Sequence, residues 1–221
     1  MTHFSDGVRE GRNFANNGTA TEPGVRMSPI NVYNVVPAAL VTNGICAQQT
    51  LAAAGNALLN GSLASGGTVT LDVPRNVIVD AAGAATAVLT ITGTDVYGIP
   101  MSEAITLNGT TAVAGAKAFK TITRIAASAA ATDFFVGTGD VFGLPIRANS
   151  RNYVLTAWNG AFVTTGTFTA AVATSPATTT TGDVRGTFAP ADAADAAKRL
   201  TLWVFVFDDD TQVGIYGVAQ A

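Results

Sequence analysis

From Asn31 onward the chain is strand-like, beginning with the alternating NVYNVV (Asn31–Val36), and from residue 68 it consists of short segments in which apolar and polar residues alternate, with turn residues between them. Such alternation is typical of strands with one buried face, whereas helices repeat apolar residues every three to four positions. The clearest segments are AVLTITGTD (Ala87–Asp95), SEAITLNG (Ser102–Gly109) and AFKTITRIAA (Ala118–Ala127), and the strand-like runs NYVLTAW (Asn152–Trp158) and RLTLWVFVF (Arg199–Phe207) follow at short intervals. They predict an all-β fold, an antiparallel β-sandwich or barrel of jelly-roll or immunoglobulin-like type.

The composition favours the same fold class. Hydrophobic residues make up 48% of the chain and charged residues only 12%, about half the usual charged share. Long amphipathic helices need many charged residues on their exposed face, so the composition favours short strands joined by small-residue turns. Monomeric surfaces usually carry more charge, so we expect partners to cover much of this surface.

The first 29 residues differ from the rest of the chain. They are polar, rich in Gly and Asn, and lack apolar periodicity. We interpret them as an extended N-terminal arm (residues 1–29) before a β-rich domain (residues 30–221), which holds either one unit or two packed β units at about 67–145 and 146–221. Segments of this kind are often disordered tails; we instead expect the arm to lie along another chain or a neighbouring subunit.

Local patterns give four further expectations. Thr68–Ala81 predicts two β segments separated at Pro74, because proline lacks the N–H that a central strand needs. Ala38–Leu59 fits a strand and a short helix, and the sequence leaves the choice open. Ala191–Arg199 follows Pro190 and contains good helix formers, so it predicts a brief helix. In Ala118–Ala127, alternation places on one face Phe119, Thr121, Thr123 and Ile125, and on the other Lys120, Ile122 and Arg124.

One short motif recurs. DVYGIP begins at Asp95, DVFGLP at Asp140 and a weaker DVRGTFAP at Asp183, at spacings of 140 − 95 = 45 and 183 − 140 = 43 residues. Asp bonds nearby backbone, Gly accepts positive φ and Pro ends a strand, so the motif predicts the same corner in two or three hairpins. A metal site built from the three Asp residues is the less favoured interpretation, since one carboxylate per turn is far short of a calcium loop.

Residues for catalysis are scarce. The single histidine, His3, lies in the arm, and the single cysteine, Cys46, lies in an Ala-rich context that favours core packing. Ordinary Ser-His and Cys-His nucleophile systems are therefore absent. A carboxylate pair of the glycosidase kind would draw on Asp72, Asp80, Asp95, Glu103, Asp133 and Asp140. The only tryptophans, Trp158 and Trp203, lie inside apparent strands, so we predict no enzyme and assign no catalytic, cofactor or metal residues.

Charge and hydropathy limit the partners and the compartment. The net charge is −3 and no Lys/Arg cluster is present, which argues against direct nucleic-acid binding. The most apolar run, Leu202–Phe207, is too short to span a bilayer, and the N-terminus lacks the apolar core of a signal peptide. A lone cysteine fits synthesis in a reducing cytoplasm.

Three surface features each allow two interpretations. Asp208–Asp210 reads more readily as a solvated hairpin turn, with Gln212–Tyr216 returning, than as a cation site or an acidic contact. Thr178–Thr181 reads as a loop, flexible or packed against a neighbour. Tyr97 and Phe142, at the repeated corners, would be exposed in a host-binding module but more often close a sandwich core.

The middle of the chain resembles a known class of protein. The segments that carry the resemblance are PRNVIVDAA from Pro74, VLTITGTDVYGIPMSEAITLNGT from Val88, GAKAFKTITRI from Gly115, FFVGTGDVFGLPIR from Phe134 and DVRGTF from Asp183. Together they resemble small virion structural proteins of tailed bacteriophages, over about residues 68 to 205. These are strand and turn signatures, and no catalytic residue comes with them.

The resemblance implies a capsid decoration (cement) protein, made in the host bacterial cytoplasm and carried on the virion. Such a protein binds the major capsid protein on the outer shell, across neighbouring subunits, and is expected to form a homotrimer. The other interpretations are a tail-tube, head–tail joining or fibre component, and an immunoglobulin-like host-adhesion module.

Overall fold

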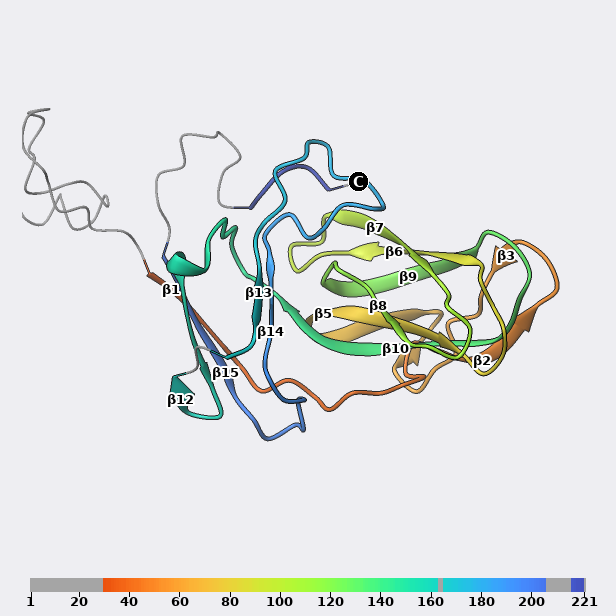
Figure 1. Cartoon of the computed structure of the whole chain (residues 1–221), viewed down its shortest axis with the longest axis horizontal. Helices are drawn as coiled ribbons and strands as arrows, with labels where there is room; N and C mark the ends of the chain where they lie inside the picture. Colours follow the sequence, from red (N-terminus) through yellow and green to blue (C-terminus); the bar gives the residue numbers. More distant parts are fainter. Residues whose placement is uncertain (1–29, 163–164, 206–215, 221) are drawn as a thin grey trace, which may run out of the picture.

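The computed structural model describes residues 30–162, 165–205 and 216–220, and shows an all-β protein with antiparallel sheets (Figure 1). One 3-10 turn, η1 (Arg151–Tyr153), accompanies the strands. The strands are β1 (Ile30–Val35), β2 (Cys46–Leu51), β3 (Gly55–Asn56), β4 (Ala64–Ser65), β5 (Thr68–Ala81), β6 (Val88–Thr94), β7 (Pro100–Thr106), β8 (Val113–Ala114), β9 (Phe119–Ala127), β10 (Ala131–Gly143), β11 (Val154–Trp158), β12 (Ala161–Phe162), β13 (Thr167–Thr169), β14 (Thr187–Ala189) and β15 (Leu200–Phe205).

Two sheets make up the fold. The large sheet has the order β13-β14-β10-β5-β9-β6-β7, with β2, β3, β4 and β8 paired to its inner strands. The small sheet has the order β1-β15-β11-β12 and lies at the end of the molecule that carries the start of β1 (Figure 1). The expected all-β antiparallel sandwich is confirmed. The expected arm, residues 1–29, lies outside the described residues.

Buried apolar side chains form two clusters. The first lies within the large sheet and its connections, and includes Leu89, Ile91, Phe119 and Phe134. The second fills the space between the end of the large sheet and the inner face of the small sheet, and includes Phe142, Phe188, Trp158, Leu202 and Val204. β14 pairs with β10 across the proposed boundary at residue 145, so the division into units at 67–145 and 146–221 stays a prediction.

Pro74 does not divide its segment, contrary to the sequence prediction. β5 runs without interruption from Thr68 to Ala81. The pairing of β5 with β9 shifts register between Thr70 and Arg75, and its pairing with β10 is irregular between Thr138 and Phe142. Proline is tolerated inside a strand at such a bulge, because no ladder hydrogen bond is required there.

The predicted alternation in β9 is also wrong. Phe119, Ile122 and Ile125 are all fully buried, whereas Thr123 and Arg124 are exposed. The β6–β9 pairing shifts between Thr92 and Gly93, so a bulge turns Ile122 to the core side. A Cβ at residue 93 would lie 1.9 Å from the backbone O of Thr121. Only glycine allows this close approach, and the alternation in β9 alone does not reveal it.

Two segments contain no helix. Ala191–Arg199 forms bends and irregular backbone, because Asp195 bonds the N–H groups of Ala197 and Lys198 in an Asx turn, and Ala196 has a φ of +65°. Side-chain bonding of this kind competes with helix formation. Ala38–Leu59, left open by the sequence, forms β2 and β3 with turns between them. Among the described residues no helix is long and apolar enough to cross a membrane.

Candidate interaction surface

The side of the small sheet that faces away from the large sheet is apolar. We name this surface the outer face and define it by Ile30, Val32, Leu155, Phe162, Trp203 and Phe205. The exposed fraction is 76% for the Phe162 side chain, 60% for Val32 and 49% for Leu155, and Trp203 and Phe205 are half-buried. Large side chains this exposed on adjacent strands form a patch, and such patches mark interaction sites.

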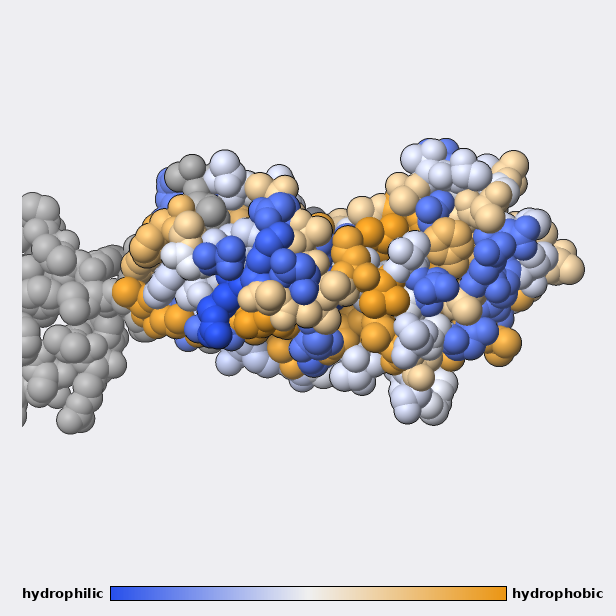
Figure 2. Space-filling view, turned by 90° about the horizontal axis from the view of Figure 1, so that it is seen from below, coloured by the Kyte–Doolittle hydropathy of each residue, from blue (hydrophilic) through white to orange (hydrophobic). Residues whose placement is uncertain are grey.

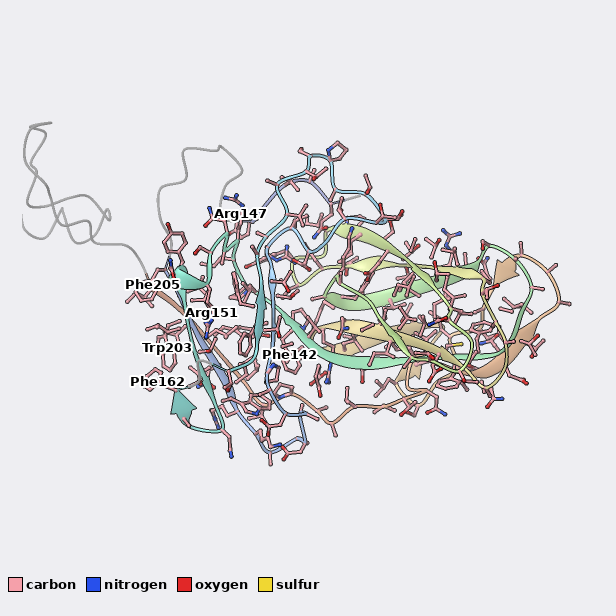
Figure 3. All side chains as sticks on the ribbon, viewed as in Figure 1. Phe142, Arg147, Arg151, Phe162, Trp203 and Phe205 are labelled. Carbon is pink, nitrogen blue, oxygen red and sulfur yellow. The ribbon has the colours of Figure 1, made fainter. Side chains whose placement is uncertain are left out.

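Strand register brings the outer face together. Trp203 of β15 is paired with Val32 on one side and with Leu155 on the other, and Phe205 is paired with Ile30. Side chains directly opposite across a ladder lie on the same face and contact each other. The Phe162 ring stacks on Trp203 with centroids 5.3 Å apart. In Figure 3 the aromatic side chains of Phe162, Trp203 and Phe205 lie on the side away from the large sheet, and Phe142 lies on the inner side.

The space-filling view shows where hydrophobic residues gather on one side of the molecule (Figure 2). In Figure 2 hydrophobic residues lie at the end of the described molecule that carries the small sheet, and another apolar area lies midway along the same view. Arg151 instead projects to the inner side of the small sheet, where it donates to the Thr156 hydroxyl at 2.7 Å and lies over the Phe188 ring. Arg199, next to the start of β15, is an exposed charged residue that borders the outer face, and its guanidinium donates to Asn34 Oδ1 at 3.3 Å. The six residues that define the outer face are themselves uncharged.

The repeated motif forms the same predicted turn at Asp95 and at Asp183, and part of a strand at Asp140. Asp95 forms the predicted corner: its Oδ1 accepts the N–H groups of Tyr97 and Ile99, and Gly98 has a φ of +79°. Pro100 begins β7 rather than ending a strand.

The motif at Asp140 lies inside β10 until Gly143, so the predicted corner is wrong there. Asp183 again bonds a downstream N–H, that of Arg185, and Gly186 has a φ of +89°.

The aspartates of the motif are bonded to cationic or backbone groups. Asp95 pairs with Arg185 at 2.8 Å, with both side chains at most 2% exposed. Asp140 pairs at 2.6 Å with Arg75, which also binds the carbonyls of Ala38 and Gly139. Asp183 accepts the N–H of Ala118. In the described ranges no three His, Cys, Asp or Glu side chains gather as metal ligands.

The other candidate carboxylates also bond within the fold. Asp72 reaches Arg75 at 3.4 Å and accepts the N–H of Ala38, and Asp80 accepts the N–H of Ala81. Asp133 is bonded to Thr50. Glu103 accepts the N–H groups of Ala116 and Lys117. The bonds of Asp72, Asp133 and Glu103 join separate segments of the chain, whereas the bond of Asp80 stays within β5.

Glu103, Lys117 and Asp183 form a buried cluster beneath the loop at Thr178–Thr181. Burial raises the pKa of Glu103 and of Asp183 above their usual values, and burial lowers the pKa of Lys117. The Lys117 ammonium donates to the carbonyl of Thr178 at 2.8 Å. Thr178–Thr181 is indeed a loop, and it packs against β7 of its own chain, where the carbonyl of Thr179 accepts the N–H of Ala104.

The remaining residues singled out from the sequence fall into three groups: buried in a core, exposed, or outside the described residues. Cys46 is fully buried in the large-sheet core, as expected, and burial raises the pKa of its thiol to about 11. Phe142 is fully buried, whereas Tyr97 is 47% exposed beside Arg185. Trp158 faces the inner core. His3 and Asp208–Asp210 lie outside the described residues.

A pocket lies next to the Asp95 corner. It has a volume of about 550 Å³ and its lining includes Asp95, Tyr97, Arg185, Tyr216 and Gln220. The rings of Tyr97 and Tyr216 meet edge to face, with centroids 4.9 Å apart. An Asp–Arg pair at the base and aromatic walls give it the character of a small binding pocket.

The sequence interpretation missed the outer face. We treated Leu202–Phe207 only as the most apolar strand of the chain. A strand with one solvent-exposed face alternates apolar and polar residues. This run does not: Leu202 and Val204 face the core, and Trp203 and Phe205, which are also apolar, face outward. An unbroken apolar run in a strand was the signal that both of its faces need covering.

Comparisons with protein-family models, with curated proteins and with solved structures gave no match for this chain.

Proposed function

We propose that this protein is a non-enzymatic structural component of a tailed-bacteriophage virion. In this proposal it decorates the capsid, binding the outer shell across neighbouring major-capsid subunits and stabilising the head. The observation that carries the proposal is the outer face: an uncharged apolar patch on rigid strands, suited to burial against another protein. The phage assignment within that structural role comes from the resemblance of residues 68 to 205.

The distribution of charge supports a structural role. Arg75, Arg185 and Lys117 are buried and bonded inside the fold, where they join loops to strands. The charged share of the chain is already low. Burying part of it leaves more of the surface to uncharged residues, which cost less to desolvate when a partner binds.

The arm supplies a second contact in this proposal. Residues 1–29 precede β1, and β1 forms one border of the outer face. An arm that leaves from this border reaches the same partner surface as the outer face. Docking an extended segment costs conformational entropy, and a shell with many subunits offers the large surface needed to offset it.

The proposal is tested by co-sedimentation. The full chain is mixed with undecorated shells assembled from the major capsid protein of the same genome, and bound protein is measured after gradient centrifugation. We expect the wild type to bind and the double variant Trp203→Ser, Phe162→Ser to bind at least about 10-fold more weakly, as expected for the loss of central aromatic contacts. The matched control is Leu58→Ser, since Leu58 is 67% exposed and lies outside the small sheet.

Other outcomes would contradict the decoration proposal or one of its parts. Wild-type protein that does not bind shells would remove the decoration proposal. Equal binding by the wild type and the outer-face variant would remove the outer face as the contact. Full binding by a folded chain that lacks residues 1–29 would remove the arm from the mechanism. Rings of about six chains or open polymers would instead favour a tail-tube or head–tail joining component.

The pocket favours a second candidate, a host-adhesion module. Tyr97 is half exposed at a pocket with a charged base, a suitable arrangement for a glycan or a small polar ligand. Glycan-array binding that is lost in Tyr97→Ser, with the variant still folded, would support this candidate. An array without a binding partner for the wild type would leave the decoration proposal preferred.

A further inference from the structure

The outer edge of β1 has no strand beside it in the described structure. β1 is the first strand of the small sheet and pairs only with β15, on its inner side. Its six residues, INVYNV, pair in regular register without a bulge. An edge strand presents unpaired N–H and C=O groups in a row, ready to bind a further strand.

This edge also lacks the usual protection against pairing. Natural edge strands carry Lys or other charges, proline, or bulges that prevent a second chain from adding. Ile30–Val35 has no charged residue and no proline. The β7 edge of the large sheet differs, because a loop of the same chain lies against it and the Thr179 carbonyl accepts the N–H of Ala104. In the described structure the β7 edge is thus partly occupied, and the β1 edge is free.

A second copy of this chain fits the free edge. β1 has no charged residue of its own, and the cation bonded to it, Arg199, is held by Asn34 Oδ1 at 3.3 Å near the end of the strand. The middle of the strand, around Val32, therefore meets a second copy without like-charge repulsion. Two identical strands pair antiparallel across a two-fold axis, an arrangement that closes with one contact and satisfies both edges. The opposite edge of the small sheet, β12, is only two residues long. A six-residue strand is therefore matched by another β1 and not by β12.

We propose that two copies of this chain pair through their β1 edges into one continuous antiparallel sheet of eight strands. A two-fold axis perpendicular to the sheet places both outer faces on the same side. Val32 of each copy then lies at the centre, and the two apolar patches form one surface. The inference deepens the proposed function and rests on it only for the use of that surface: a dimer docks on the shell with two outer faces at once, and linked sites raise the effective affinity.

The test is the mass of the purified full chain in solution, by size exclusion with light scattering. The wild type is expected at twice the chain mass of 22.4 kDa. The double variant Val32→Lys, Asn34→Lys is expected at the single-chain mass. Residues that point to the same side lie opposite each other in antiparallel pairs, so lysine meets lysine whether Val32 faces Val32 or Asn34 of the second copy. Both side chains are exposed, and the one bond lost is that from Arg199 to Asn34 Oδ1 at 3.3 Å. Circular dichroism checks that the variant keeps its fold.

The matched control is Leu155→Lys with Phe162→Lys. It adds the same charge to the same outer face, away from the β1 edge, and is expected to remain a dimer. If the control dissociates as fully as the edge variant, the copies associate face to face and the edge proposal is overturned. A wild type at three times the chain mass, as the phage resemblance implies, also overturns it.

A wild type at the single-chain mass overturns the proposal too. Hydrogen exchange then assigns the edge: protected β1 amides in a single chain mean that the chain's own N-terminal residues cover it. Failure of this inference is distinct from failure of the proposed function. A dimer that does not bind shells would contradict the proposed decoration function and leave the pairing of β1 edges standing. A single chain that binds shells would contradict the pairing and leave the decoration function standing.

Discussion

The outer sides of the two sheets differ in one respect. In the large sheet, β6 and β7 place Leu89, Ile91 and Met101 in the core and turn Thr90, Thr92 and Ser102 outward. In the small sheet, β15 places Leu202 and Val204 in the core and turns Trp203 and Phe205 outward. These strands of the large sheet thus bury one apolar face and turn polar residues outward, whereas β15 carries apolar residues on both of its faces. The large sheet covers one face of β15 through the second cluster, and the other face of β15 belongs to the outer face.

The edges show the same contrast. The large sheet has its β7 edge partly occupied by a loop of its own chain, whereas the small sheet has its β1 edge without a partner strand among the described residues. An apolar face next to an open edge attracts another chain in two ways, by burial of apolar surface and by backbone hydrogen bonds. The small sheet therefore contains the features that we assign to assembly.

The largest expected effect comes from the same substitution made in the two regions. Phe134→Ala, in the fully buried core of the large sheet, should lower the free energy of unfolding by about 3–5 kcal/mol, because it leaves a cavity. Phe162→Ala, on the outer face, should lower it by less than about 1 kcal/mol, as is usual for exposed positions. Denaturant titration measures both. Equal losses would show that Phe162 is part of a core and would end the comparison.

The buried ion pair of the large sheet should be nearly as sensitive as its apolar core. Arg185 connects the segment before β14 to the β6–β7 corner through Asp95. Arg185→Met leaves the Asp95 carboxylate buried without its cation, which should cost about 3–5 kcal/mol. Adding Asp95→Asn should restore part of the loss, because the amide oxygen still accepts the two backbone N–H groups. Lys198→Met, at an exposed ion pair, is the control and should change stability little. An equal loss in the single and double variants would contradict this account.

Thiol labelling compares how accessible a side chain in the large-sheet core and a side chain on the outer face are to a reagent in solution. Cys46 is buried, and burial raises the pKa of its thiol to about 11, so thiolate is scarce at neutral pH. In Leu155→Cys the new thiol, on the outer face, should react with an aromatic disulfide reagent roughly 100-fold faster than Cys46 or more, because Cys46 reacts only after local opening. Similar rates for both thiols would mean that the large sheet opens as readily as the outer face is reached.

The smallest effect is a pH dependence specific to the large sheet. Burial raises the pKa of Glu103, which faces Lys117 and Asp183. A carboxyl group with a raised pKa in the folded state binds more protons there than in the unfolded state, so its contribution to stability falls as pH rises from its usual pKa through the folded value. The difference in unfolding free energy between Glu103→Gln and the wild type should therefore shift in favour of the variant from pH 4 to pH 7. A shift in favour of the wild type would contradict the sign.

Part of the candidate site was within reach of the sequence. The apolar run Leu202–Phe207 was visible, and so was the absence of charge in Ile30–Val35. Their contact was not, since β1 and β15 lie far apart in the chain and only their pairing brings Val32 next to Trp203. The ion pair between Asp95 and Arg185 joins two repeats of one motif, and the repeat itself indicated only a shared turn.

Local alternation and turn chemistry were enough to predict the all-β class, the positions of most of the longer strands, the burial of Cys46 and the corner at Asp95. They favoured a core position for Tyr97 as much as for Phe142, and for Tyr97 that prediction is wrong. The continuation of β5 through Pro74, the bulge of β9 opposite Gly93, and the outward Trp203 and inward Trp158 became evident only from the folded chain. The physical reason is that bulges, register and the choice of buried face depend on the neighbouring strand. That strand is set by long-range pairing, which the local sequence does not specify.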